Sequence, residues 1–494
     1  MKRYLTLILS VVGLATYAQT IDNLELLNVR ELQGSARYQA LGGAFTALGN
    51  DPSAIHLNPA AAPVYRFDQL SLSLGFQGTS GDYLLIENQN TANNFNVNIE
   101  NLGMVRDFNI GSGDWSNLSF GLTFSKLANF NRDYTISTSN SGTPLVEYWL
   151  DGVYGLTPNQ ALEGGFFDEY AAYEAAILDP ENTGILDTTA IGNYGASNNL
   201  NYDRNARGSL NEFAATFGGQ YKEKFYYGIS VGIPILNYGV EDEIVENGFQ
   251  PNAYPYDATG YSLFRTDYLS GSGFNLKLGI IARPVNWLRI GMAYETPTWY
   301  TINQIYETEV TGIYGSETIR SQTSSTGNFS YKVQTPSVYR PGIAFVFGQK
   351  GLISVDYEFT DASNTSAYVG NNSLNVNEDE LSLSTAEFTS VTTSAQAIKV
   401  GGEYRMGAFS LRAGYHYRKS FYETPENFRG DYIAYSGGLG YRNKNFGVDL
   451  TMVSSSYNRQ DFVHPYLFTN ETGDQMVDGI ISRFNVITGF SIRF

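Results

Sequence analysis

The amino-acid sequence predicts an all-β protein: a 14-stranded antiparallel transmembrane β-barrel with an N-terminal, partly helical plug in its lumen. Three observations predict this fold class. Segments of about ten residues alternate apolar and polar side chains, the connections between them alternate between short and long, and the last segment ends on Phe494. The composition agrees, because 42% of the residues are hydrophobic, only 16% are charged, and Tyr, Phe and Gly are abundant.

The first residues have the pattern of a secretory signal peptide. Lys2 and Arg3 form a basic start, 5–15 is an apolar run, and Thr16-Tyr17-Ala18 offers a cleavage site before Gln19. The run is too short for a helix that spans a membrane. The sequence therefore predicts a signal peptide over 1–18, followed by a plug over 19–66 and a barrel over 67–494.

The plug segment, 19–66, lacks strand alternation and is too short to hold a core of its own. Residues 38–48 read as short helical pieces that end at Gly49-Asn50. Asp51-Pro52 reads as the start of a second helix, which must stop near Asn58 because Pro59 disfavours a helical residue before it. The simplest place for these pieces is inside the barrel.

The barrel strands show a period of two. In the first, Leu70, Leu72, Leu74 and Phe76 alternate with polar or small residues. The same period recurs in later segments: 118–124, 225–233, 274–280, 288–294, 339–347, 353–359, 398–404, 409–417, 433–441 and 446–452. Such strands have one apolar and one polar face, which is also true of a soluble sandwich, so the period alone does not choose between the two folds.

The lengths of the connections favour the barrel. Tight turns are expected at 222–224, 284–286, 348–351, 405–408 and 442–445. Long polar connections are expected at 78–94, 139–208, 234–270, 298–334, 361–393, 419–430 and 456–480. Short turns on one side and long loops on the other are typical of barrels in the outer membrane of Gram-negative bacteria. An even strand number then places both barrel ends on the short-turn, periplasmic side.

Two strands carry additional signals. In the second strand the alternation breaks near Glu100-Asn101, which predicts a bulge or kink. In the last strand Phe484, Phe490 and Phe494 share one face, so we expect a closing strand with an aromatic carboxyl-terminal residue.

The plug segment also resembles a known family. It reads Gly34-Ser35-Ala36-Arg37, then 41–47 (LGGAFTA), then 50–54 (NDPSA), and it ends in Asn58-Pro59-Ala60. This order resembles the N-terminal hatch of the FadL/TodX outer-membrane transporters. The resemblance implies uptake of hydrophobic molecules, long-chain fatty acids or aromatic hydrocarbons, with lateral release beside an inward-kinked strand. It identifies no residues of the barrel wall.

Five residues are candidates for the floor of a ligand pocket on the hatch. Phe45 and Leu48 offer apolar surface, and Asn58, Pro59 and Ala60 form the turn of the resemblance. An apolar ligand gains about 25 cal/mol for each Å² that such a pocket buries. Plain packing against the barrel wall explains Phe45 and Leu48 equally well.

Other chemistry finds little support in the sequence. The net charge of −18 argues against nucleic acid as a partner. The three histidines, His56, His416 and His464, show neither metal-ligand spacing nor a nucleophile motif, although His416 shares a predicted lumen face with charged residues. We therefore expect no catalytic residue, no metal and no cofactor. The expected partners are a hydrophobic small molecule and outer-membrane lipid.

A second function remains open. Barrels similar to PorV have the same barrel and hatch but act as assembly platforms for a protein secretion system. The long outer loops, 139–208 above all, could bind a protein partner instead of covering a ligand site.

Overall fold

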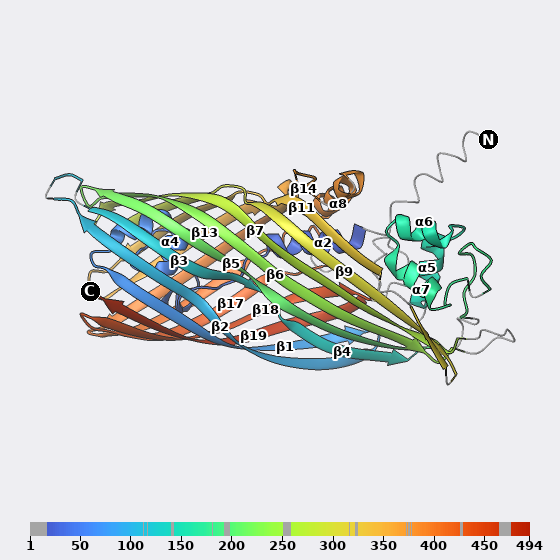
Figure 1. The fold of residues 1–494 in the computed structure, drawn as a ribbon. Coiled ribbons are helices and arrows are strands. Elements are labelled where there is room, and N and C mark those ends of the chain that lie inside the picture. Colours follow the sequence, from blue (N-terminus) through green and yellow to red (C-terminus); the bar gives the residue numbers. More distant parts are fainter. Residues whose placement is uncertain are drawn as a thin grey trace.

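The computed structural model describes residues 17–494 except 112, 116, 140–142, 180, 192–197, 250–257, 316, 322–324, 372, 374–375, 377, 425–427 and 464–475. The predicted signal peptide therefore lies outside the described residues, except for Tyr17 and Ala18 at the start of the first described helix. His464 lies outside them as well. The described chain forms one long antiparallel barrel with helices inside it and at one end (Figure 1).

The wall consists of strands in chain order. They are β1 (Gln69–Leu85), β2 (Asn88–Asn109), β3 (Asn117–Asn129), β4 (Arg132–Ser139), β5 (Asn199–Tyr221), β6 (Phe225–Asn247), β7 (Gly260–Val285), β8 (Leu288–Glu295), β9 (Trp299–Tyr314), β10 (Glu317–Arg320), β11 (Ser325–Gln334), β12 (Val338–Val346), β13 (Gly351–Asp361), β14 (Ser366–Tyr368), β15 (Ser394–Met406), β16 (Phe409–Arg418), β17 (Tyr432–Arg442), β18 (Phe446–Phe462) and β19 (Met476–Arg493).

These segments make 14 wall positions, as the sequence predicts. Four positions are each shared by two segments. β3 and β4 share one position and both pair with β5, while β8 and β9 share another and both pair with β7. β12 and β11 share the next position and pair with β8 and β9, respectively, and β13 and β14 share the last and pair with β12 and β11. The short β10 only extends β9. The pairing of β1 with β19, from Gln69↔Arg493 onward, closes the barrel and leaves both of its ends on the same side.

Most of the long connections are much shorter than predicted. The expected loop 78–94 is strand on both sides of a two-residue turn, because β1 ends at Leu85 and β2 begins at Asn88. β6 and β7 likewise take up most of 234–270, and β9 to β11 take up most of 298–334. These parts extend beyond the outer apolar band. Their outward side chains no longer meet lipid, while their buried inward side chains include apolar ones such as Leu263 and Val310. The apolar outer face that marks a wall strand therefore ends there, although the ladder continues.

The predicted irregularity in the second strand is confirmed. Ser73 of β1 pairs with Asn101 while the next residue, Leu74, pairs with Ile99, so Glu100 is an extra residue in the ladder. Glu100 is fully buried and accepts a hydrogen bond from Gln39 Nε2 at 3.1 Å. The bulge thus turns a carboxylate toward the plug.

The outside of the wall carries large apolar side chains. Phe217, Ile280, Phe409 and Leu439 are each about 60% exposed, at 61%, 59%, 59% and 60%. The predicted closing strand also turns its aromatic side chains outward, since Phe484 is 51% exposed. An exposed apolar surface of this extent is unstable in water and is the normal exterior of a membrane barrel.

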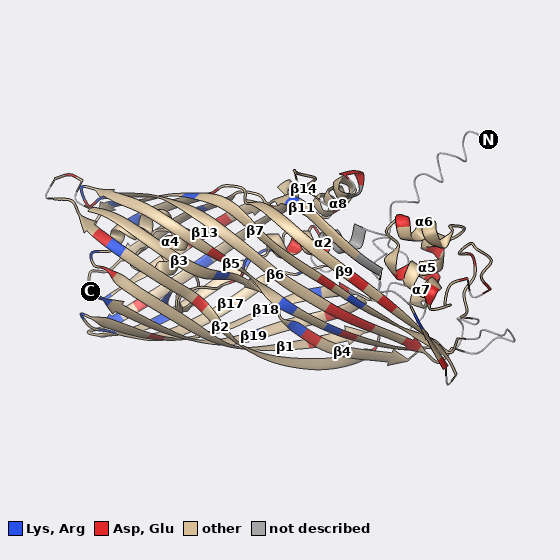
Figure 2. Ribbon diagram, in the orientation of Figure 1, with Lys and Arg blue, Asp and Glu red and all other residues tan. Residues whose placement is uncertain are grey.

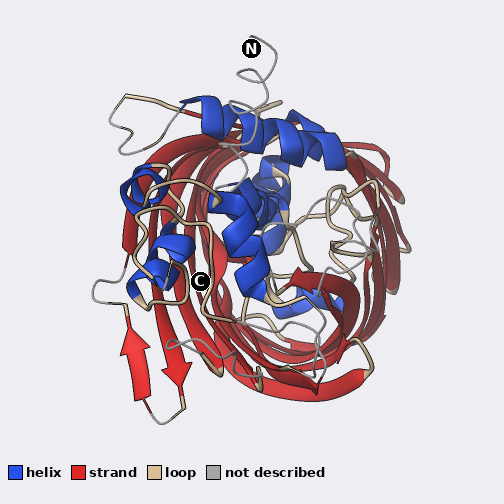
Figure 3. Cartoon of the chain, turned by 90° about the vertical axis from the view of Figure 1, so that its right-hand side faces the viewer, coloured by secondary structure: helices blue, strands red, loops and turns tan. Residues whose placement is uncertain are grey.

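The N-terminal helices lie within the ring of strands, which Figure 3 shows from the end that carries the long connections. They are α2 (Tyr17–Asn28), α3 (Ala36–Ala40), α4 (Pro52–Leu57) and the 3₁₀ helix η1 (Pro59–Val64). α4 begins as predicted, with the Asp51 side chain accepting from Ser53 N, and ends before Asn58. The prediction for 38–48 was wrong in extent. Only α3 is helical there, because Gly42 and Gly43 take positive φ values of 61° and 77°.

Three further helices, α5 (Leu145–Val153), α6 (Pro158–Glu163) and α7 (Phe167–Glu174), sit at the mouth of the barrel. The short η2 (Ala362–Asn364) and α8 (Glu378–Val391) lie in the connection predicted as the loop 361–393. No helix among the described residues is long and apolar enough to cross a membrane.

Candidate functional site

The turn at Asn58 fixes the hatch to the wall. The Asn58 side chain donates from Nδ2 to Thr46 O at 2.7 Å and accepts from Ala60 N at 3.0 Å. A third, longer bond joins Nδ2 to the wall at Ile280 O, at 3.3 Å. One amide therefore satisfies backbone groups of two plug segments and contacts the barrel, all of it away from water.

The wall is recessed where this turn touches it. A Cβ atom added at Gly279 would stand 1.8 Å from Asn58 Oδ1, and one added at Gly228 would stand 2.4 Å from the carbonyl carbon of Pro59. Any larger residue at these two positions would displace the hatch. Glycines of β6 and β7 thus form the seat of the turn 58–60.

The two apolar candidates pack inside the plug. Phe45 and Leu48 are 0% and 2% exposed, and the Phe45 ring lies 5.4 Å from that of Tyr38 and under the Arg37 guanidinium. Asn58 and Ala60 are fully buried as well. None of the five candidate residues lines the cavity described next, so their contact with a ligand stays a prediction.

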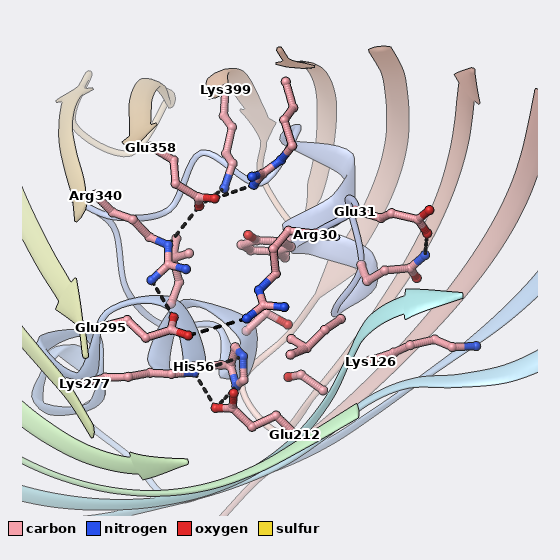
Figure 4. A pocket seen from close by; sticks show the side chains of 17 residues that line it. Arg30, Glu31, His56, Lys126, Glu212, Lys277, Glu295, Arg340, Glu358 and Lys399 are labelled. Carbon is pink, nitrogen blue, oxygen red and sulfur yellow. Dashed lines mark hydrogen bonds and ion pairs between the residues drawn. The ribbon is translucent and has the colours of Figure 1, made fainter. Parts of the chain in front are cut away.

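A cavity of about 60 Å³ lies above the hatch. It is lined by residues from the plug and from both sides of the wall: Arg30, Glu31, Gln33, Tyr38, Ser53, His56, Leu57, Ser125, Lys126, Leu127, Glu212, Lys277, Glu295, Arg340, Glu358, Lys399 and Arg418. Figure 4 shows their side chains converging on the space, with Arg30 near its centre. The lining is mostly charged, whereas the sequence predicts an apolar pocket.

The charges on the wall side form two groups of ion pairs. Glu212 bonds Lys277, while Glu295 bonds Arg340 at 2.9 Å and Glu358 bonds Arg340 at 2.8 Å, Lys399 at 2.9 Å and also Arg418 (Figure 4). Each of these buried charges thus has a partner of opposite sign. The sequence showed charges on this lumen face but could not show the pairing, which depends on strand register.

His56 joins the hatch to the pair of Glu212 and Lys277. Its ring lies 3.3 Å from Lys277 Nζ and 3.7 Å from Glu212. Burial, followed by the neighbouring ammonium group, lowers the pKa of His56 to about 4. The imidazole is therefore neutral at neutral pH.

We expect the hatch to loosen as the pH falls through the range set by His56. The unfolded imidazole binds its proton near pH 6.5, so the folded state binds fewer protons between about pH 6.5 and 4 and loses stability over that interval. The protection factors of the α4 amides, which are exchange rates corrected for their intrinsic pH dependence, should be lower at pH 5 than at pH 7. His56→Gln should remove most of this difference. An equal pH dependence in the variant would assign it to other groups.

His416 is buried against Tyr432, with the ring centroids 5.5 Å apart, and neither ring nitrogen has a hydrogen-bond partner among the described residues. The part of the chain that the structure describes contains no group of three or more His, Asp or Glu that could hold a metal ion. His416 therefore offers no ligand set for a metal.

The wall is incomplete between β2 and the β3/β4 position. Their ladder ends at Asn101↔Ser125. From there toward the end of the barrel that carries the long connections, β2 pairs only with β1. Side chains bridge the gap instead: Asn98 accepts from Lys126 at 2.6 Å, and Asn96 accepts from Asn131 at 2.9 Å. Further up, Asn94 bonds Asp133 and Asn88 bonds Thr138. We call this break the asparagine seam.

The asparagine seam lies between the cavity and the outer apolar band. Ser125, Lys126 and Leu127, at its inner side, line the cavity. On its outer side Phe95 and Val97 of β2 are 65% and 60% exposed. The resemblance implied a gap of this kind without identifying the strand. A run of asparagines within a strand, at 88–98, is the sequence signal that could have indicated it, since Asn is depleted in strands.

A cap of α5 to α7 is held to the barrel mouth by buried carboxylates. Glu246 accepts from Leu145 N at 2.9 Å, and Asp168 accepts from the Tyr306 hydroxyl at 2.6 Å. Figure 2 shows acidic residues gathered at this end. The cap thus lies over the end opposite the one where the barrel begins and ends.

No protein-family model and no curated protein matches this chain. Solved structures do match its fold. The Pseudomonas putida toluene transporter TodX gives a TM-score of 0.54 at 14% identity, over 94% of this chain and 99% of TodX. A FadL homologue of Pseudomonas aeruginosa gives 0.56 at 12% identity, and the Ralstonia pickettii toluene transporter TbuX gives 0.51 at 15%, each over 94% of this chain and 99% of the other.

At these identities the likeness concerns the fold. It extends over nearly the whole of each chain, plug and barrel included. The fold that the resemblance of the hatch sequence implied is therefore confirmed, and the chain shares the barrel architecture of TodX, TbuX and the FadL homologue.

Proposed function

We propose that this protein takes up hydrophobic small molecules across the outer membrane and releases them sideways through the asparagine seam. The observation that carries the proposal is the seam itself, where a lumenal cavity meets a stretch of wall that has no backbone ladder. A wall that only had to be stable would keep that ladder, because unpaired backbone groups are costly within a membrane.

The ligand class follows from the surroundings of the seam. An apolar molecule that leaves sideways between Phe95 and the facing strand passes into lipid without returning its surface to water. The hatch closes the direct route to the periplasm. Two of the three similar structures are toluene transporters, which supports this class of ligand, and they give no support to the alternative of an assembly platform.

Closing the seam should abolish uptake. The chain has no cysteine, so Asn96→Cys with Asn131→Cys introduces the only two thiols, at positions whose side chains are bonded now. Joining them with a short bifunctional thiol reagent should lower the uptake of a fluorescently labelled dodecanoic acid to about a tenth or less, because the gap can no longer widen.

The matched control is Leu102→Cys with Phe124→Cys, a pair in the same two strands just below the seam, where the ladder is intact. Its cross-link should leave uptake unchanged. If cross-linking at 96 and 131 has no effect on uptake by correctly folded barrels, the seam is not the exit.

A further inference from the structure

The wall has a second break, between the β13/β14 position and β15. The ladder of β13 and β15 ends at Asp361↔Ser394, with one more bond from Ala362 N to Thr393 O at 3.2 Å. Above this point β14 pairs with β11 on one side only. Within the described chain, a helix faces its other edge where a strand would be expected.

That helix is α8, which lies on the outside of the wall beside β11 and β14 (Figure 1). The Thr385 hydroxyl accepts a hydrogen bond from Ala367 N at 3.1 Å and donates to Leu381 O at 2.8 Å. One side chain thus satisfies the open edge of β14. A single hydroxyl stands where a continuous ladder would otherwise join two strands.

Apolar side chains fill the break from both sides. Leu381 and Phe388 of α8 are 5% and 0% exposed and belong to the same cluster as Leu24 and Leu27 of α2, inside the lumen. The cluster also contains buried inward residues of the wall, such as Leu236 and Ile302. Here an apolar core runs through the wall without interruption.

The small size of the residues around the break keeps it wide. Ala362, Ala367 and Ala395 frame it and contribute to the same cluster. If α8 moved away, the frame would leave an opening lined by methyl groups and by the leucines of α2. Such an opening accepts an unbranched apolar chain and offers nothing to a polar solute.

The two breaks lie on opposite sides of the barrel. Counting wall positions from β1, the asparagine seam separates the second from the third, and the α8 break separates the ninth from the tenth. The difference of seven positions is half of 14. Both breaks are closed by side chains alone, with polar groups at the first and mainly apolar ones at the second.

The break also lies at the right height to exchange molecules with lipid. Tyr357 and Ile398, paired four residues below its lower edge, are exposed on the outer apolar band at 37% and 46%. Leu383 on the outer face of α8 is 53% exposed. The break therefore opens at the upper margin of that band.

We propose that the break between β14 and β15 is a second lateral port, through which an unbranched alkyl or acyl chain passes between lumen and outer leaflet when α8 lifts. The proposal rests on the proposed uptake of hydrophobic molecules and adds a route to it. Lifting α8 uncovers Leu381 and Phe388, and the passing chain covers the apolar frame in their place, so the motion exposes little surface to water.

A reversible lock tests the port. Thr385→Cys with Ala367→Cys places two thiols where the hydroxyl now meets the β14 backbone, and the chain itself has no cysteine. In a chain whose seam is already cross-linked, oxidation should lower the remaining uptake of fluorescently labelled dodecanoic acid at least threefold, and dithiothreitol should restore it. The control pair, Tyr357→Cys with Ile398→Cys, lies in the intact ladder below and should show no such change.

Three outcomes are distinguishable. Unchanged uptake in a variant whose disulfide is complete overturns the port while the proposed function stands. Failure of the wild-type protein to raise uptake above that of cells without it overturns the proposed function itself. A combined lock of both breaks should reduce uptake further than either lock alone. If uptake with both locks equals uptake with the seam lock alone, that result also contradicts the port.

A second variant keeps the test independent of the disulfide. Phe388→Trp places an indole in the break, and the purified barrel in lipid vesicles is titrated with 12-bromododecanoic acid. The fluorescence quenching of the variant in excess of that of the wild type should saturate as 12-bromododecanoic acid is added. Toluene at the same concentration should not reduce this quenching. Quenching that rises linearly with the bromolipid shows only partitioning into the bilayer and overturns the port.

Discussion

Deletion of residues 21–65 should turn a closed barrel into an ion-conducting pore. The remaining wall encloses a lumen with polar side chains such as Lys277, Asp356 and Arg412, all buried now against the plug or one another. A barrel of 14 strands is too wide for its own side chains to fill, so water should enter once the plug is gone. We expect the single-channel conductance in planar bilayers to rise at least about tenfold.

The barrel should survive this deletion because its own ladder closes it, from Gln69↔Arg493 around to β18 and β19. The contacts to the plug that are lost include those of two buried wall carboxylates, Glu403 with Arg37 at 3.0 Å and Glu100 with Gln39 at 3.1 Å. Both carboxylates then face water, which removes the penalty of leaving them unpaired. Normal heat-modifiability on gels is the control for folding. Conductance as low as that of the intact protein would show that 21–65 is not the plug.

The sequence could predict the part of the wall that meets lipid. Leu70 to Phe76 alternate because their outer neighbours are lipid and their inner ones the polar lumen, and the bulge at Glu100 was visible because it interrupts that alternation. Beyond the apolar band the outward side chains no longer meet lipid, although inward ones such as Tyr83 and Leu85 stay buried. The strands at 78–94 therefore lose the apolar outer face that marks the wall, and the sequence predicts a loop where the ladder continues.

The two breaks in the wall depend on contacts that sequence alone does not show. Asn94 ends the predicted loop 78–94, and Asn96 and Asn98 belong to the second predicted strand. Only the register shows that these side chains bridge to the segment from β3 to β4. α8 has buried apolar residues at Leu381 and Phe388, too few for a clear helical period in a polar segment. That α8 covers a break in the wall can be seen only from the missing ladder between β14 and β15.

The hatch turn was the most predictable part of the site. Asp51, Pro52 and Pro59 set the limits of α4 by local rules, and Asn58 makes the turn bonds expected of it. The ion pairs around Glu212 and Glu358 could not be inferred, because each joins strands far apart in the chain.

Replacing Asn58 by Ala together with Ala60 by Leu should reduce uptake while the barrel still assembles. The first change leaves Thr46 O and Ala60 N without their partner, at roughly 1–3 kcal/mol for each buried group. The second forces a larger side chain into a fully buried position beside the wall, at about 1–3 kcal/mol. Together these penalties act on the hatch turn and not on the strand ladder.

We therefore expect uptake of labelled dodecanoic acid per folded barrel to fall about tenfold, since the displaced hatch no longer shapes the floor beneath the cavity. Surface abundance and heat-modifiability should stay normal, and Asn286→Ala, in the exposed turn between β7 and β8, is the control for losing an amide. If the turn only assists folding, abundance should fall in proportion to uptake and the ratio should stay constant. A displaced floor must change transport in every barrel that reaches the membrane. A constant ratio of uptake to abundance would therefore show that Asn58 and Ala60 are structural residues of the hatch and not part of the transport site.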